Sequence, residues 1–426
     1  MKKILNPDRK TWPELAQRPK TDPLAVGETV NQVFDAVGLK GDEALKEFTL
    51  KFDRVALNTL AVGEEVIKMA SEKVSTELKQ AIAIAKNNIT QFHIAQKEGI
   101  KIIATTPGVN CWRESRPIEK VGIYIPGGSA PLFSTVLMLG IPAKLAGCKE
   151  IILCTPPDSL GDINPVILYT AQLVGISKIF AVGGIQAIAA LSLGTQSIPL
   201  VDKIFGPGNQ YVTAAKQKAQ ALGLAIDMPA GPSEVLIIAD KTANPAFVAA
   251  DLLSQAEHGA DSQVILLADN ESIIDQTLAE LAHQAAVLPR FEIIKQALEN
   301  SKAILFNNLS DALAFSNLYA PEHLILATEK ARALIAEVSN AGSVFLGNYS
   351  CESAGDYASG TNHTLPTNGY ARNYSGVSLD SFIKKITFQE ISQEGIQNLG
   401  PAISLMAEAE QLMAHQNAVN IRLKAI

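Results

Sequence analysis

The sequence predicts an α/β protein with two mainly parallel sheets, and three observations support that class. From Val121 onward, nine short β-branched runs alternate with segments rich in alanine and leucine. Strands that are each followed by about 10 to 15 residues of helical pattern are typical of βαβ units. Nine strands are too many for one modest sheet, so we expect two α/β domains. The hydrophobic fraction of 47% and the charged fraction of 19% are typical of a soluble chain with a large core.

Periodicity gives the order of the elements. From about residue 24 to residue 100, apolar residues recur at three- and four-residue spacing, which predicts helices. After about residue 376, "SLDSFIKKITFQEISQEGIQNLG" leads into a final helix, which predicts an appended helical tail that packs elsewhere. Between these regions lie the nine runs that we expect to be strands: VGIYIPGG, EIILCTPP, KIFAVGG, DKIFGPGN, EVLIIAD, SQVILLAD, AILFNN, HLILAT and GSVFLGN.

Charge and composition exclude several classes of protein. The net charge is −7 and the pI about 5.5, with no basic cluster larger than a pair such as Lys384 and Lys385, so no nucleic-acid partner is expected. No run approaches about 18 apolar residues and no apolar segment follows the first lysines, so neither a membrane span nor secretion is expected. The scattered cysteines indicate reduced thiols in the cytoplasm. Cys148 and Cys154 bracket a predicted strand and are expected in the core, while Cys111 and Cys351 lack the adjacent basic partner that would activate a nucleophile.

Three predicted strands end in glycine-rich turns that open helices, between residues 126 and 209: IPGGSAPLF, VGGIQAIAAL and GPGNQYVTAA. Free N–H groups at such a helix start bind anions, so each turn is a candidate for the pyrophosphate of a dinucleotide. None matches the GxGxxG pattern with an acidic residue about 20 positions later. Glycine is also ordinary in the turns of any parallel sheet, so both readings stay open.

The stretch "DLLSQAEHGADSQVILL" places polar groups at the end of a predicted helix. Gln255 and His258 are three residues apart and share one helical face. An amide oxygen and an imidazole nitrogen are both acceptable ligands for Zn²⁺. Asp356 and His363, in a glycine-rich loop after a strand, are candidates to complete the set. The alternative is a capped, solvated helix end.

The stretch "YAPEHL" places Glu322 and His323 directly before a predicted strand. A buried glutamate and a neutral histidine are the side chains most readily tuned as acid and base near neutral pH. A surface pair is the alternative reading of so short a motif. His415, in "MAHQNAV", is a further histidine with polar neighbours.

Taken together, these segments resemble the histidinol dehydrogenase family. The matching stretches span nearly the whole chain in the family's order: VGIYIPGGSAPLFSTVLML, VDKIFGPGNQYVTAAK, IDMPAGPSEVLIIAD, DLLSQAEHG, YAPEHL, ESAGDYASGTNHTLPT and EAEQLMAHQNAVNIR.

The resemblance implies an enzyme that oxidises L-histidinol through the aldehyde to L-histidine, with two NAD⁺ consumed and one Zn²⁺ per subunit. It implies Glu322 and His323 as the catalytic acid–base pair. The implied zinc ligands are Gln255, His258, Asp356 and, from the other subunit of a dimer, His415. The implied substrate contacts are these ligands, the catalytic pair and Ser233, His363 and Glu410, while the implied NAD contacts are Tyr124, Gln186 and Asn209.

The family fold implied by the resemblance is a cytoplasmic homodimer whose subunit has two related, incomplete Rossmann-like α/β domains. A small N-terminal helical arm and a C-terminal helical tail exchanged across the dimer complete it. The expected boundaries are residues 1–20 for the arm, 21–122 with 235–375 for the domain with the metal and catalytic residues, 123–234 for the NAD-binding domain, and 376–426 for the dimerisation tail.

Three other functions stay open on the residues alone. A paralogous dehydrogenase of the same fold would oxidise another polar alcohol, such as a sulfonated diol, because specificity depends on few atoms. A zinc hydrolase would use Glu322 as the base and would need no nucleotide. A noncatalytic metal-binding scaffold fits poorly with so many polar groups at loop ends.

Overall fold

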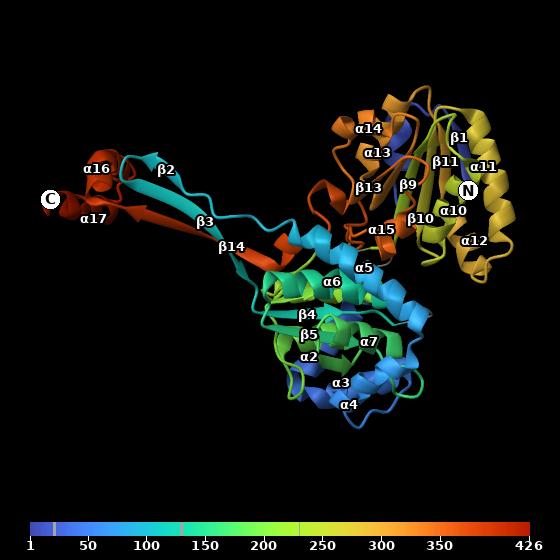
Figure 1. Cartoon of the computed structure of the whole chain (residues 1–426), viewed down its shortest axis with the longest axis horizontal. Coiled ribbons are helices and arrows are strands. Elements are labelled where there is room, and N and C mark those ends of the chain that lie inside the picture. Colours follow the sequence, from blue (N-terminus) through green and yellow to red (C-terminus); the bar gives the residue numbers. More distant parts are fainter. Residues whose placement is uncertain (20–22, 128–130, 230) are drawn as a thin grey trace.

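The computed structural model describes residues 1–19, 23–127, 131–229 and 231–426. They form two α/β domains and an arm that projects away from both (Figure 1). One domain contains a six-stranded sheet, the other a five-stranded sheet, and the arm a three-stranded sheet. We call these parts the six-stranded domain, the five-stranded domain and the arm. The strands of the first two sheets pair in parallel, which confirms the predicted class.

Each of the nine predicted runs contains a strand. The six-stranded sheet has the order β1 (Lys2–Leu5), β11 (Lys302–Leu305), β10 (Gln263–Ala268), β9 (Glu234–Ala239), β12 (His323–Ala327) and β13 (Ser343–Leu346). The five-stranded sheet has the order β6 (Lys178–Ala181), β5 (Glu150–Thr155), β4 (Lys120–Tyr124), β7 (Lys203–Phe205) and β8 (Ala225–Ile226).

Beyond their first residues, the central strands of the six-stranded sheet are apolar because helices cover both faces of the sheet. In β9, Val235 and Ile237 enter one hydrophobic cluster while Leu236 and Ile238 enter the cluster on the opposite face. This alternation is what the two-residue period of a strand requires when both faces are buried. The helices of the six-stranded domain are α1 (Trp12–Leu15), α10 (Pro245–Ala256), α11 (Glu271–Ala285), α12 (Phe291–Glu299), α13 (Leu309–Tyr319), α14 (Ala331–Leu334) and α15 (Glu352–Tyr357).

The first residues belong to the six-stranded domain and do not form a separate helical arm. Strand β1 pairs in parallel with β11 at the edge of the sheet. Trp12 is buried beside Phe306 and Phe315, with ring centroids 5.4 and 5.8 Å away. The expected boundary at residues 20 and 21 lies outside the described residues.

The helical region that follows packs on the five-stranded domain, so the expected grouping of residues 21–122 with 235–375 differs from the structure. Val33 and Phe34 share a hydrophobic cluster with Ile188 and Val212. The physical reason is that this cluster buries one face of the five-stranded sheet, which its own helices α8 and α9 cover only in part. The helices of this domain are α2 (Pro23–Lys40), α3 (Asp42–Phe48), α4 (Glu64–Ala70), α5 (Thr76–Ile94), α6 (Phe133–Ala146), α7 (Pro165–Leu173), α8 (Gly184–Leu193) and α9 (Gln210–Ala221).

The tail is not wholly helical, which corrects the expectation for residues after 376. Strand β14 (Ile383–Ile391) pairs antiparallel with β3 (Val109–Pro117), and β2 (Ile103–Thr106) pairs with the other edge of β3. Helices α16 (Gln393–Ala409) and α17 (Met413–Lys424) pack on each other at the far end of this sheet (Figure 1). No helix in the described part of the chain is both long and apolar enough to cross a bilayer.

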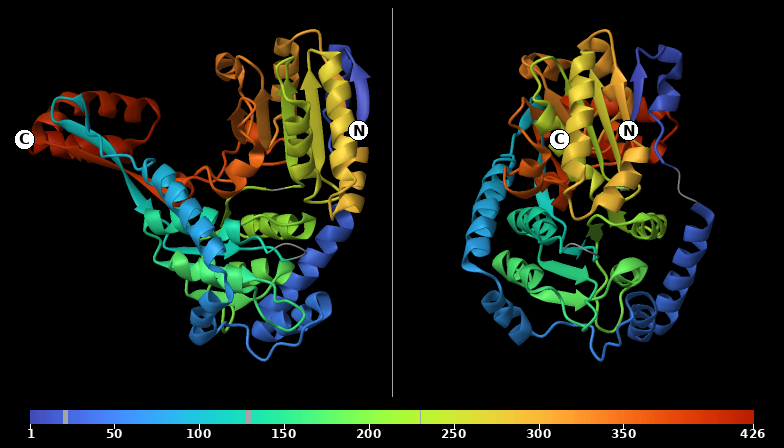
Figure 2. Two further views of the ribbon diagram at one scale, coloured as in Figure 1. Left: turned by 45° about the vertical axis from the view of Figure 1, so that its right-hand side comes forward. Right: turned by 90° about the vertical axis from the view of Figure 1, so that its right-hand side faces the viewer.

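The two domains face each other through opposite ends of their sheets (Figure 2). The six-stranded domain presents the amino ends of β9 and β12, where Ser233, Glu322 and His323 lie. The five-stranded domain presents the carboxyl ends of β4 and β7, where Tyr124 and Pro207 lie. Parallel sheets generally bind ligands at their carboxyl ends, so only the five-stranded domain follows the general rule.

Candidate active site

A cavity of about 860 Å³ lies between the two domains. Its walls combine a polar cluster of the six-stranded domain with turns of the five-stranded domain. The structure thus brings together side chains that are far apart in the sequence, such as Tyr124 and His363. Nine of the predicted site residues line it: Tyr124, Asn209, Ser233, Gln255, His258, Glu322, His323, Asp356 and His363.

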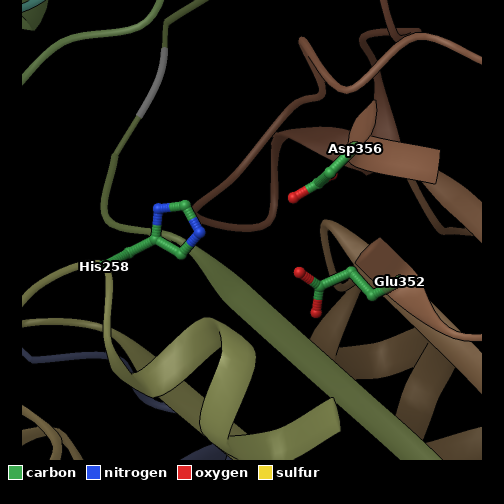
Figure 3. A group of neighbouring side chains, drawn as sticks. All are labelled: His258, Glu352 and Asp356. Atoms are coloured by element: carbon green, nitrogen blue, oxygen red, sulfur yellow. The ribbon is translucent and has the colours of Figure 1, made fainter. Parts of the chain in front are cut away.

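One wall of the cavity carries a group of side chains suited to holding a cation. Gln255 lies in the last turn of α10 and His258 just beyond it, while Glu352 and Asp356 lie one turn apart on α15. Ligand atoms of His258, Glu352 and Asp356 all lie within 4.8 Å of one another, and the three side chains point toward a common space (Figure 3).

Two oxygens at this wall lack the partners that buried polar atoms normally have. Gln255 Oε1 and Asp356 Oδ1 are buried and make no hydrogen bond within the described part of the chain. An unsatisfied buried acceptor costs about 1–3 kcal/mol, so atoms of this kind call for an explanation. Amide oxygen, carboxylate and imidazole together form a donor set that suits Zn²⁺. The residues present therefore fit a divalent cation at this point.

Sequence reasoning missed Glu352. Its side chain is buried, and Oε1 accepts a hydrogen bond of 2.5 Å from Gln255 Nε2. A carboxylate only accepts, so this contact turns the Gln255 amide nitrogen toward Glu352 and its oxygen toward the cavity. The four-residue spacing between Glu352 and Asp356 in "ESAGDY" is the signal that could have found it, because residues so spaced share a helical face.

Glu322 directly precedes β12 and His323 is the first residue of that strand. Both side chains are buried at the cavity wall. Glu322 Oε2 accepts a 2.9 Å hydrogen bond from the backbone N–H of Glu234. The His323 Nδ1 atom lies 3.1 Å from the Glu234 carbonyl oxygen. A carbonyl only accepts, so this contact favours the ring tautomer with its proton on Nδ1. Gln255 Nε2 lies 3.2 Å from the same Nδ1 but makes the shorter contact of 2.5 Å with Glu352 Oε1, to which it donates. His323 Nε2 then keeps a lone pair, has no hydrogen-bond partner, and lies 3.5 Å from Asp356 Oδ1.

Burial and neighbouring charges shift the pKa values of Glu322 and His323. Desolvation raises the pKa of Glu322 to about 8. Burial alone would lower the pKa of His323, but the carboxylates of Glu322 and Asp356 more than offset it and raise that pKa to about 10. A cation held by Asp356 would neutralise part of this negative charge and favour the neutral ring. A carboxyl with a raised pKa is a stronger base, once ionised, than an ordinary glutamate.

Two further histidines at the cavity are held neutral. Desolvation lowers the pKa of His258, which lines the cavity and is exposed. Desolvation also lowers the pKa of His363. The His363 Nδ1 lies 2.9 Å from the carbonyl oxygen of Asp356, and its Nε2 lies 3.1 Å from the hydroxyl of Thr135 on α6. His363 thereby links the cation ligands to the five-stranded domain.

Two of the three predicted cofactor contacts lie at the cavity and one does not. Tyr124 and Asn209 line the cavity, whereas Gln186 is buried in α8 and does not. The Asn209 side chain caps α9 by accepting from two backbone N–H groups. Gly206 has a φ of +132°, and a Cβ there would lie 2.1 Å from the Tyr124 carbonyl oxygen, so this glycine also has a structural reason. Of the first glycine-rich turn, residues 128–130 lie outside the described residues.

Glu410 follows α16 and His415 lies in α17, and both are exposed. This helix pair lies at the far end of the arm, away from the two domains of the same chain (Figures 1 and 2). Within one chain the structure does not bring these two predicted residues into the site. Cys148 and Cys154 are buried in the core, and burial raises the pKa of both thiols, to about 11 for Cys148. Neither has the lowered pKa that a nucleophilic thiolate needs.

Fold and site together are those of a two-domain α/β enzyme with a cavity between its domains. Residues 16–423 match the family model described as histidinol dehydrogenase. Histidinol dehydrogenase of Bacteroides thetaiotaomicron is 57% identical over 426 residues and all of both chains. That of Shigella sonnei is 54% identical over 404 residues, 94% of this chain and 92% of its own. The chain belongs to the histidinol dehydrogenase family.

Solved structures agree with this assignment. A crystal structure of histidinol dehydrogenase from Elizabethkingia anophelis matches with a TM-score of 0.98 and 62% identity, covering 100% of this chain and 98% of that one. An acetylating aldehyde dehydrogenase from Geobacillus thermoglucosidasius matches with a TM-score of 0.50 and 16% identity, covering 89% and 94% of the two chains. The second likeness concerns the fold alone.

Proposed function

We propose that this chain oxidises L-histidinol through L-histidinaldehyde to L-histidine, as a step of histidine biosynthesis in the cytoplasm. Family membership supports the substrate. The observation that carries the chemistry is the convergence, on one cavity, of a buried Glu322–His323 pair and of buried oxygens without partners. We propose NAD⁺ as the oxidant and one Zn²⁺ per subunit of a homodimer.

The residues that would hold Zn²⁺ are Gln255, His258 and Asp356, with His415 of the partner subunit. When bound, the ion supplies a Lewis acid that fixes substrate nitrogens in place, and NAD⁺ supplies the hydride acceptor. Ser233, His363 and Glu410 of the partner subunit complete the proposed substrate contacts. Tyr124, Gln186 and Asn209 are the proposed cofactor contacts, of which Tyr124 and Asn209 line the cavity.

His323 carries the first proton. Its Nδ1 proton is held by the Glu234 carbonyl, which leaves the Nε2 lone pair free to accept the hydroxyl proton of the alcohol as a hydride leaves the carbinol carbon. The alcohol thereby loses two electrons and becomes the aldehyde. Because the ring is held in one tautomer and one orientation, proton transfer requires little reorganisation energy.

Glu322 serves the second oxidation. Its ionised carboxyl takes a proton from a water molecule, whose oxygen adds to the aldehyde carbon while protonated His323 returns its proton to the carbonyl oxygen, and the hydrate forms. His323 then takes a hydroxyl proton of the hydrate as a second hydride leaves its carbon, which yields the carboxylic acid. Loss of the acid's proton to solvent gives the carboxylate. The cavity between the domains retains the reactive aldehyde between the two steps.

Product stoichiometry tests the proposed function. The full-length protein is expected to form two NADH per L-histidinol, because both oxidations occur at one site. The measurement is NADH absorbance at completion with limiting histidinol. One NADH per substrate would contradict the second oxidation. No NADH would contradict histidinol as the substrate, and this is the result expected of a hydrolase or of a dehydrogenase of another alcohol. A sulfonated diol serves as the comparison substrate.

A shared active site predicts complementation between inactive chains. Glu322→Gln and His415→Asn each remove a different part of the same site, one from the cavity and one from the arm. Heterodimers would then contain one site with both defects and one site with neither, so about half of the sites should recover activity. The measurement is activity after mixing, with subunit exchange shown by two affinity tags. Exchange without recovery would contradict the shared site.

A further inference from the structure

Glu234, the first residue of β9, holds both members of the acid–base pair through its backbone. Its N–H donates to Glu322 Oε2 at 2.9 Å, and its carbonyl oxygen lies 3.1 Å from His323 Nδ1. A displacement of this one peptide segment would therefore move a carboxyl and an imidazole together. What fixes Glu234 also fixes the proposed acid and base.

The Glu234 side chain is fixed by an arginine from the start of the chain. Arg18 Nη2 donates to Glu234 Oε2 at 2.8 Å, and Arg18 Nε donates to Oε1. Both side chains are mostly buried, with 14% and 3% of their surfaces exposed. A bidentate pair of this kind sets direction as well as distance, because the guanidinium fork matches the two carboxylate oxygens.

Arg18 also contacts the turn at Tyr319 and Ala320, which lies just before Glu322 and His323. Its guanidinium lies 3.9 Å from the centroid of the Tyr319 ring and donates to the carbonyl oxygens of Tyr319 at 2.9 Å and Ala320 at 3.3 Å. Ala320 has a φ of +56°, a conformation that costs a non-glycine residue energy and persists only where its surroundings hold it. Ala320 stands two residues before Glu322.

We infer that Arg18 is a positioning residue for Glu322 and His323, acting through Glu234 on one side and through the Tyr319–Ala320 turn on the other. The inference rests on the proposed function for the reaction that it affects, but its geometry stands on the contacts alone. Arg18 itself lines the cavity. Through its contacts with Glu234, Tyr319 and Ala320 it would make the N-terminal segment part of the catalytic apparatus.

Arg18→Met tests the inference, with Arg9→Met as the matched control. Arg9 lies in the same segment, also pairs with a carboxylate, Asp311 at 2.8 Å, and also lies over a ring, that of Trp12, but it is exposed. Arg18→Met is expected to lower kcat of both oxidations by about 10- to 100-fold, the usual effect of losing an outer-shell partner. The KM values should change little, because substrate contacts remain. Arg9→Met should leave both constants unchanged.

Two further variants separate positioning from binding and from folding. Glu234→Gln keeps the backbone contacts but weakens the pair with Arg18, so it should share the kcat loss, and its combination with Arg18→Met should add little further loss. Arg18→Lys, which keeps the charge but not the fork, should fold where Arg18→Met fails and should recover only part of kcat. A raised KM for NAD⁺ with unchanged kcat would mean that Arg18 contacts ligand directly, and would overturn the inference. Unchanged kcat with a lowered melting temperature would also overturn it.

A crystal structure of Arg18→Lys tests the geometry without any substrate. The inference predicts that Glu322 Oε2 moves out of hydrogen-bond distance of the Glu234 N–H. An unchanged hydrogen bond of 2.9 Å would overturn it. Failure of the wild-type protein to oxidise histidinol, in contrast, would overturn the proposed function and leave this structural result to decide on Arg18.

Discussion

Glu322→Gln is expected to slow the oxidation of L-histidinaldehyde by about 10²- to 10⁴-fold, the usual contribution of a positioned base. Oxidation of L-histidinol to the aldehyde should slow far less, because His323 carries the proton of that step. The amide keeps the shape of the side chain and lines the same cavity, but it cannot take a proton from water. The measurement is single-turnover NADH formation from each of the two substrates.

Glu329→Gln is the matched control for this prediction. Glu329 is exposed just beyond the other end of β12, so its substitution should leave both oxidations unchanged. Equal losses in the two oxidations of Glu322→Gln would contradict the role in activating water. Such a result would indicate instead that Glu322 only holds its neighbour His323 in place.

His258→Asn is expected to abolish high-affinity zinc binding and, with it, nearly all oxidation of L-histidinol. A ring nitrogen of His258 lies close to the carboxylate oxygens of Asp356 and Glu352, where the proposed ion would bind. The shorter asparagine side chain does not reach this position. Loss of one ligand from a four-ligand site leaves a weak binding site for Zn²⁺. Steady-state activity in the presence of added Zn²⁺ measures how much binding remains, with recovery only at high metal concentration.

The exposed His283 on α11 provides the control for metal bound elsewhere on the surface. His283→Asn should keep both zinc and activity. Loss of both in His283→Asn as well would mean that the metal is held by scattered surface histidines and would contradict the proposed ligand set.

The strands could be predicted from the sequence because strands buried on both faces read as continuous apolar runs between glycine-rich turns. The runs at residues 234–240 and 323–328 show this most clearly, and they form neighbouring interior strands of the six-stranded sheet. The strand β14 was missed for the opposite reason. Most of its residues are exposed, and its lysines and glutamate resemble the polar face of a helix.

The packing of the N-terminal helices could not be predicted from their periodicity. An amphipathic pattern shows that Val33 and Phe34 face a core, but it does not show which of two similar sheets supplies that core. The family resemblance suggested the wrong partner for this segment. Only tertiary contacts with α8 and α9 decide it.

The spacing of residues in the sequence identified part of the candidate site but missed the residues that hold it in place. Gln255 and His258 share a helix end, and Glu322 and His323 are adjacent, so local patterns revealed both pairs. Arg18 and Glu234 contact each other across 216 residues of sequence. No local pattern marks a residue whose partner is so remote.

The zinc content of the purified full-length protein tests the central claim most directly, that Gln255, His258 and Asp356 converge on one cation. Elemental analysis after dialysis against a weak chelator would compare wild type, His258→Asn and His283→Asn. The account predicts one zinc per chain in wild type and in His283→Asn, and almost none in His258→Asn. Full zinc content in His258→Asn, or none in an active wild-type protein, would contradict it.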